Sequence, residues 1–111
     1  MAKDDFFVIA YRILLYLYEC MKAGEDPHID EISAERLKIP ERYYYSIIRI
    51  LYKNGYIDGV KEIHTPWTRE TYYDFGHPEI TMGGIEFIHN NSSMAKAKEA
   101  LKEFKAMVPG L

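Results

Sequence analysis

The chain has 111 residues, a hydrophobic content of 48% and a formal net charge of −3 at pH 7. This length suits one folded domain with its own core, and the apolar content is too high for a disordered chain. The net acidity excludes indiscriminate binding to polyanions, although it is compatible with a local basic face. The single cysteine, Cys20, excludes an internal disulfide, so we expect a cytoplasmic protein.

The N-terminal segment predicts a helix that Asp4 or Asp5 caps and that Gly24 ends. The apolar arc of this helix is wide, so the helix must be buried on more than one side. The C-terminal helix or a second subunit could cover the additional side. We expect a homodimer, with the second apolar stripe in its interface: Phe7, Tyr11, Leu14 and Tyr18. Arg12 and Glu19 interrupt the apolar run, which is also too short to span a bilayer, so we expect no signal peptide and no membrane partner.

The next segment predicts the two helices of a helix-turn-helix. Residues 28–30 predict a short strand that pairs with a later hairpin, and Asp30 is expected to cap a short helix over residues 31–37. After a turn at Pro40, a third helix runs from about residue 41 to about residue 54. Its core face is predicted to be Tyr44, Ile47, Ile48 and Leu51.

The remaining residues predict a hairpin followed by two helices. Residues 56–64 read as a strand, and residues 70–75 alternate as a returning strand that the sequence 76–78 breaks. Thr81 is expected to cap a fourth helix, and the last helix covers about residues 94–107. The predicted fold class is mainly α with a small β-hairpin (α+β), a winged helix-turn-helix with an added C-terminal helix, in one domain.

A second periodicity runs along the third helix, away from its core face. Arg42, Ser46, Arg49 and Lys53 recur at intervals of four, three and four residues, which at about 100° per residue places them in a stripe about 60° wide. Tyr43 flanks this basic stripe. Arginine can read guanine edges, serine and lysine can contact phosphates, and a helix fits the major groove. The same pattern is also typical of a solvated helix face, and both interpretations are open.

The loop between the two predicted strands carries Trp67 and Arg69. Wing tips contact the DNA backbone or the minor groove, and arginine suits a narrow minor groove. Alternatively, Trp67 folds back as a lid over the hairpin. The ten tyrosines are also open to two interpretations, as contacts to a partner or as packing at the edge of the core, which we expect for Tyr56, Tyr72 and Tyr73.

No arrangement of side chains predicts catalysis. The histidines and the single cysteine lack the spacing of a metal site. Serine, histidine and aspartate are not arranged for covalent catalysis either. We therefore expect that the protein is not an enzyme and that it has no metal and no cofactor.

Three phrases of the sequence carry a family resemblance: LYKNGYIDGV at residues 51–60, ITMGGIEFI at residues 80–88 and NSSMAKA at residues 91–97. In this order they resemble the YjcQ-like winged-helix proteins of Gram-positive bacteria and their prophages, and the likeness covers most of the chain. The resemblance implies a winged-helix fold and implies little about a ligand.

The sequence therefore predicts two functions. The first is a sequence-specific protein that binds double-stranded DNA, as a small bacterial or prophage transcriptional regulator. It would place Arg42, Ser46 and Arg49 in the major groove. The residues on the DNA backbone would be Lys53, Trp67 and Arg69. The alternative is a protein–protein interaction module without DNA binding, which the net acidity and the apolar first helix favour. DNA binding should weaken steeply with salt, whereas an aromatic protein interface should not.

Overall fold

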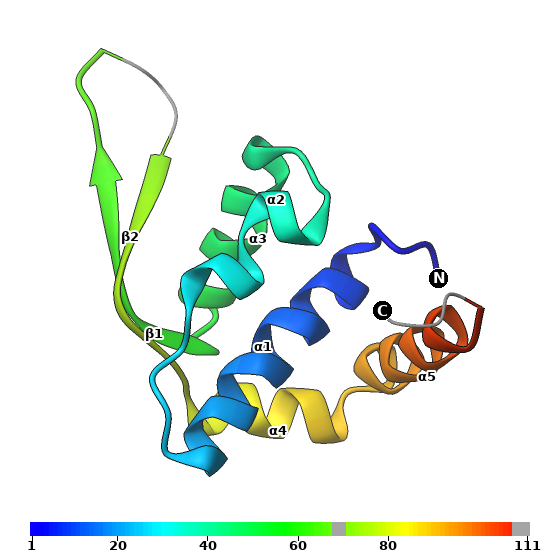
Figure 1. Cartoon of the computed structure of the whole chain (residues 1–111). Coiled ribbons are helices and arrows are strands. Elements are labelled where there is room, and N and C mark those ends of the chain that lie inside the picture. Colours follow the sequence, from blue (N-terminus) through cyan, green and yellow to red (C-terminus); the bar gives the residue numbers. More distant parts are fainter. Residues whose placement is uncertain (68–70, 108–111) are drawn as a thin grey trace.

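The computed structural model describes residues 1–67 and 71–107 (Figure 1). The elements in these ranges follow in the order α1 (Phe6–Ala23), the 3-10 helix η1 (Ile29–Ile32), α2 (Ala34–Leu37), α3 (Glu41–Lys53), β1 (Ile57–His64), β2 (Thr71–Ile80), α4 (Met82–Asn90) and α5 (Ser92–Met107). This order is that of a winged helix-turn-helix, in which the β1–β2 hairpin is the wing. Helices α4 and α5 are added after it, so the predicted fold class is confirmed.

Helix α1 lies at the centre of the core. It begins after Asp5, whose carboxylate accepts a hydrogen bond from the Phe7 N–H at 2.9 Å. It ends at Gly24, which adopts the left-handed conformation and donates its N–H to the last turn. Both boundaries were predicted from the sequence. The helix contacts α3, α4, α5 and β2, and side chains from all of these elements share one hydrophobic core.

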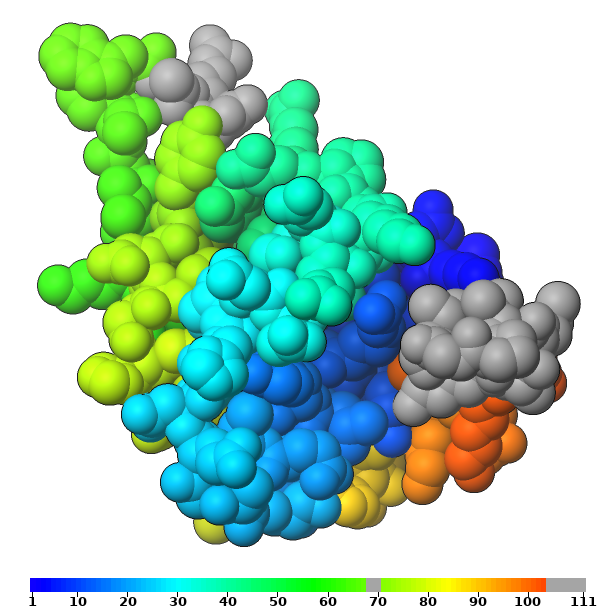
Figure 2. All heavy atoms as spheres, in the orientation of Figure 1, coloured from blue at the N-terminus to red at the C-terminus, as the bar shows by residue number. Residues whose placement is uncertain are grey.

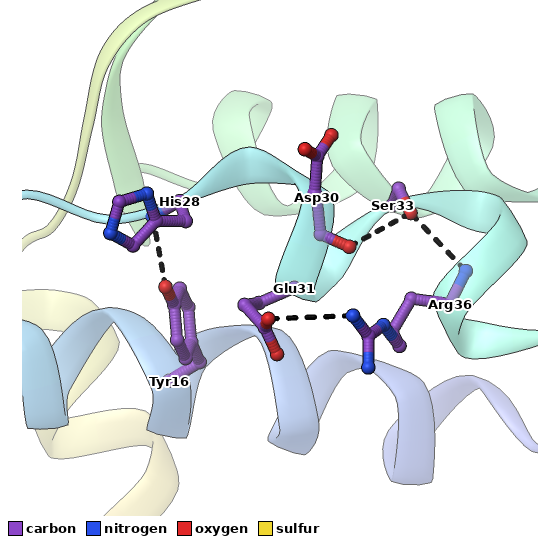
Figure 3. A network of polar contacts seen from close by, with 6 residues as sticks. All are labelled: Tyr16, His28, Asp30, Glu31, Ser33 and Arg36. Carbon is purple, nitrogen blue, oxygen red and sulfur yellow. Dashed lines mark hydrogen bonds and ion pairs between the residues drawn. The ribbon is translucent and has the colours of Figure 1, made fainter.

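The segment between α1 and α2 differs from its prediction (Figure 3). Residues 28–30 do not form a strand, because the carbonyl of His28 accepts the Glu31 N–H and begins η1. The N–H of His28 is bonded to the Tyr16 hydroxyl at 2.8 Å, which ties this segment to α1. Asp30 is not the cap of α2. Ser33 is the cap instead, since its hydroxyl accepts the Arg36 N–H at 3.2 Å.

The hairpin also differs from its prediction, because β2 continues through residues 76–78 to Ile80. An irregular pairing makes this possible: between the pairs Asp58–Glu79 and Val60–Phe75 the single residue Gly59, with a φ of +76°, lies opposite residues 76–78 of β2. A Cβ atom at Gly59 would lie 1.7 Å from the carbonyl oxygen of His77. Residues 76–78, which were predicted to end the strand, therefore belong to an irregular pairing within the sheet. The glycine at position 59 permits the close approach of the two backbones there.

The inner end of the hairpin is buried and its outer end is exposed. Ile57, Val60 and Ile80 belong to the core, whereas Lys61, Ile63 and most of the other described residues near the turn are exposed. Figure 1 shows the hairpin rising beside α3, and in Figure 2 its outer end, at the upper left, stands apart from the body of the molecule. None of the helices in the described ranges is long and apolar enough to cross a membrane.

Candidate nucleic-acid interface

Helix α3 presents two chemically different faces. The four predicted core residues, Tyr44, Ile47, Ile48 and Leu51, are all buried. On the opposite face Arg42, Arg49 and Lys53 are exposed and Ser46 is half-buried. Because residues three and four apart in a helix lie on one side, the basic stripe is a continuous surface. The structure therefore brings these four predicted site residues together.

A groove of about 540 Å³ separates α3 from β2. Its walls are formed by Glu41, Arg42, Tyr45, Ser46, Arg49, Thr71, Tyr72 and Tyr73. Three of the four residues of the basic stripe thus border a concave surface on the side of the wing. A ligand that lies along α3 would therefore also contact the hairpin.

The cations of the basic stripe differ in their partners. Within the described residues, no carboxylate forms an ion pair with Arg42 or Arg49. Lys53 is paired, with its Nζ 3.5 Å from the carboxylate of Glu62 on β1. The Ser46 hydroxyl donates to the Arg42 carbonyl within the helix at 3.1 Å. The guanidinium groups of Arg42 and Arg49 can therefore bind an external anion without first breaking an ion pair.

Glu62 was not among the predicted site residues, yet it joins the wing to the basic stripe. The Tyr73 hydroxyl donates to it at 3.3 Å, and His64 Nε2 lies 3.5 Å away. Burial raises the pKa of Glu62, but the neighbouring Lys53 and His64, with the hydrogen bonds from Lys53 and Tyr73, outweigh it and lower the pKa below its usual range. Sequence alternation places Glu62 and His64 on one side of β1, but their position beside α3 depends on tertiary packing.

Tyrosine rings fasten the wing to α3. Tyr45 stacks on Tyr73 with ring centroids 6.3 Å apart, and it meets Tyr72 edge to face at 5.5 Å. Tyr52 meets Tyr73 from about two turns further along the helix. Tyr73 is only 5% exposed, so its prediction as a residue at the edge of the core is wrong. These contacts fix the hairpin at a defined position relative to the basic stripe.

Tyr43 and Trp67 occupy contrasting places. Tyr43 turns toward the N-terminus, where its hydroxyl donates to the Asp4 carbonyl at 2.7 Å, so this hydroxyl is already occupied. Trp67 is 86% exposed at the end of the hairpin. It does not cover the hairpin, so the interpretation of this residue as a lid is wrong. Arg69, the other predicted residue of the loop, lies outside the described residues.

The second apolar stripe of α1 is covered largely within the chain. Tyr11 is 7% exposed and Leu14 is completely buried, while Phe7 and Tyr18 are half-buried. Helices α4 and α5 pack against α1 (Figure 1), and Tyr18 meets His89 of α4 edge to face at 5.7 Å. The expectation that a second subunit covers this stripe is therefore wrong for Tyr11 and Leu14, because intrachain packing already buries them. Phe7 and Tyr18 remain partly exposed, and a homodimer through them stays a prediction.

Among the residues that the structure describes, no three histidine, cysteine, aspartate or glutamate side chains converge in a way that could hold a metal ion.

Comparison with known proteins gives one result. No curated protein and no solved structure shows significant similarity to the chain. The family described as YjcQ protein matches residues 11–107, which extend from α1 to the end of α5. Because this match covers most of the sequence, the chain belongs to the YjcQ protein family.

Proposed function

We propose that this protein binds double-stranded DNA by placing α3 in the major groove, and that it acts as a small transcriptional regulator in the cytoplasm. The observation that carries the proposal is the pair of guanidinium groups on the exposed face of α3. Within the described residues neither Arg42 nor Arg49 forms an ion pair. Arginine forms bidentate hydrogen bonds with guanine O6 and N7, which is the commonest base-specific contact.

The geometry of α3 supports this proposal. Its exposed face is a continuous stripe of polar and cationic residues, and an α-helix fits the width of the major groove. Ile50 flanks the stripe and is 39% exposed. An apolar side chain at this place can contact the methyl group of thymine. The stripe can therefore distinguish bases, as well as attract phosphates.

The net charge of −3 does not oppose this assignment. Salt screens electrostatic fields beyond about 8–10 Å, so the charges within contact distance decide the interaction. On the exposed face of α3 the cations are Arg42, Arg49 and Lys53, and Glu41 adds one carboxylate to the same groove. The wing stands beside them, and we assign Trp67, which is exposed at its end, to the DNA backbone.

A titration of duplex DNA across a series of salt concentrations tests the proposal. Fluorescence anisotropy with a pool of random-sequence duplexes measures the sequence-independent part of binding. Contacts from about three cations predict that log K falls with log salt concentration with a slope of about −2 to −3. Selection from the same pool should then enrich a defined sequence. Absence of any salt-sensitive binding would contradict DNA binding.

A second candidate function is a protein-interaction module. It is favoured by the exposed apolar side chains of the outer hairpin, where Trp67 is 86% and Ile63 is 43% exposed. Such residues are enriched at the centres of protein interfaces. This alternative predicts binding to a polypeptide that depends on Trp67 and changes little with salt, so the same salt series separates the two functions.

A further inference from the structure

One carboxylate lies at the point where the wing meets the basic stripe. Glu62 extends from β1 toward α3, and its Oε2 lies 3.5 Å from the Nζ of Lys53. Lys53 is the last residue of α3 and the last member of the stripe. A negative charge is thus held next to a cation that the proposed function assigns to DNA phosphate.

The position of this carboxylate is fixed by more than the ion pair. Its other oxygen accepts a hydrogen bond from the hydroxyl of Tyr73, which is itself buried between the hairpin and α3. The side chain of Glu62 is 25% exposed, whereas that of Lys53 is 59% exposed. Lys53 is therefore the more exposed partner, and Glu62 is the one that a second contact holds. When an anion approaches, Lys53 can turn toward it while the carboxylate stays in place.

We propose that Glu62 is an internal competitor of DNA phosphate for Lys53. The inference rests on the proposed DNA-binding function. In the free protein Lys53 contacts Glu62. In the complex it must leave this carboxylate to reach a phosphate, and the carboxylate then remains beside the phosphate backbone as a repulsive charge.

This arrangement has a direct consequence for specificity. Phosphate contacts provide affinity for any sequence, whereas base contacts discriminate between sequences. A carboxylate that weakens one phosphate contact lowers sequence-independent binding and leaves Arg42 and Arg49 unaffected. Glu62 would therefore raise the fraction of binding that depends on the base sequence.

The variant Glu62→Gln tests the proposal. Glutamine has nearly the same shape and keeps an oxygen that accepts the hydrogen bond from Tyr73, but it has no charge. The matched control is Glu99→Gln on α5, since Glu99 also pairs with a lysine, Lys102, at 3.3 Å. Both variants remove one negative charge and release one lysine, but only Glu62→Gln does so at the basic stripe. Glu62→Gln also releases His64, whose Nε2 lies 3.5 Å from the carboxylate, so a double variant with Lys53→Met is needed to assign the effect to Lys53.

We expect Glu62→Gln to bind random-sequence duplex about two to five times more tightly than wild type at low salt, as the loss of an exposed charge interaction implies. The salt slope should steepen by at most about 0.9, the value of one phosphate contact, since in wild type the contact from Lys53 is opposed by the carboxylate that it leaves. Glu99→Gln should change neither quantity. The gain should disappear when Glu62→Gln is combined with Lys53→Met, because no ammonium group remains to be released. Thermal melting of each variant checks that it is folded.

The outcomes separate the two proposals. If wild type binds DNA but Glu62→Gln behaves like Glu99→Gln, or keeps its gain in the Lys53→Met background, the competition is overturned and DNA binding stands. If neither wild type nor Glu62→Gln binds duplex DNA at low salt, both proposals are overturned. A gain that requires Lys53 and exceeds that of the control supports both.

Discussion

The backbone of Gly84 in α4 lies directly against the carbonyl group of Tyr56, just before β1. A Cβ atom added to Gly84 would lie 2.3 Å from the Tyr56 oxygen. The same oxygen accepts the N–H of Thr81, and the Thr81 hydroxyl donates to the carbonyl of Gly55 and accepts the N–H of Gly84. The first turn of α4 is therefore bonded to the junction between α3 and the wing.

We expect Gly84→Ala to lower the free energy of unfolding by about 1–3 kcal/mol, since the methyl group must displace backbone atoms. Gly83→Ala is the matched control. Its Cβ atom would have no neighbour closer than 3.6 Å, and alanine in a helix is favoured over glycine by up to about 1 kcal/mol. Urea denaturation of both variants measures the difference. Equal stability of the two variants would contradict this packing of α4.

The glycine that ends α3 predicts a different kind of destabilisation. Gly55 has a φ of +76°, and a Cβ atom added there would meet nothing within 4 Å. Substitution is therefore opposed by backbone strain and not by a steric clash with neighbours. We expect Gly55→Val to cost about 1–3 kcal/mol and Gly55→Asn to cost less, because asparagine tolerates the left-handed conformation. Thermal melting compares the two, and an unchanged midpoint for valine would refute the strain.

Two consecutive tyrosines give opposite predictions. The Tyr44 hydroxyl is buried and has no hydrogen-bond partner among the described residues. Tyr44→Phe removes this unsatisfied group, so we expect the free energy of unfolding to rise by about 1 kcal/mol. Tyr43→Phe instead removes the bond to the Asp4 carbonyl and should lower stability by about 0.5–1.5 kcal/mol. Chemical denaturation measures both, and a loss of stability in Tyr44→Phe would show that its hydroxyl is bonded in solution.

The sequence predicted the features of this fold that depend on local chemistry. The four core residues of α3 follow from helical periodicity, and the ends of α1 follow from Asp5 and Gly24. The basic stripe was likewise predicted, because it is the complement of the core face on the same helix. A single helix thus specified most of the candidate site.

The features that were missed depend on contacts between distant segments. The continuation of β2 past Gly76 depends on an irregular pairing in which Gly59 of the other strand lies opposite residues 76–78, and these three residues read locally as the end of a strand. The burial of Tyr73 and the approach of Glu62 to Lys53 depend on where the hairpin packs. The apolar arc of α1 correctly indicated extensive burial, but periodicity could not tell an intrachain partner from a second subunit.

Stability should fall at high pH because buried tyrosines resist ionisation. Burial, together with the charge of Glu62 and the hydrogen bond to it, raises the pKa of Tyr73 to about 12 from its usual 10.0, and burial also raises the pKa of Tyr44. Above pH 10 the unfolded chain loses these protons first. The folded state then binds more protons, and the free energy of unfolding decreases as pH rises.

The stabilisation from Tyr73 is therefore complete below about pH 10 and is lost as pH rises through about 12. Each such tyrosine contributes a slope of up to about 1.4 kcal/mol per pH unit in this window. Denaturation at several pH values from about 8 to 11 should show a shallower decline for Tyr73→Phe than for wild type. Parallel curves for the two proteins would contradict the raised pKa.

The arginine at the centre of the basic stripe provides the sharpest test of the DNA interface. Arg49 is exposed, and alanine is a strong helix former, so Arg49→Ala should leave the melting temperature nearly unchanged. If Arg49 contacts a guanine, its loss should weaken binding to a selected target sequence by about 1–3 kcal/mol and relax the preference at one base pair. Anisotropy titrations with the target and with single-base variants of it measure both effects.

The matched control is Lys98→Ala, which removes the same charge from an exposed position on α5. Both variants lower the net charge equally, so a general electrostatic effect would weaken binding to the same extent in each. A contact within the major groove predicts instead that only Arg49→Ala loses sequence preference. If both variants bind the target as tightly as wild type, the exposed face of α3 is not the DNA-binding surface. The exposed apolar side chains of the outer hairpin are then the better candidate for an interaction site.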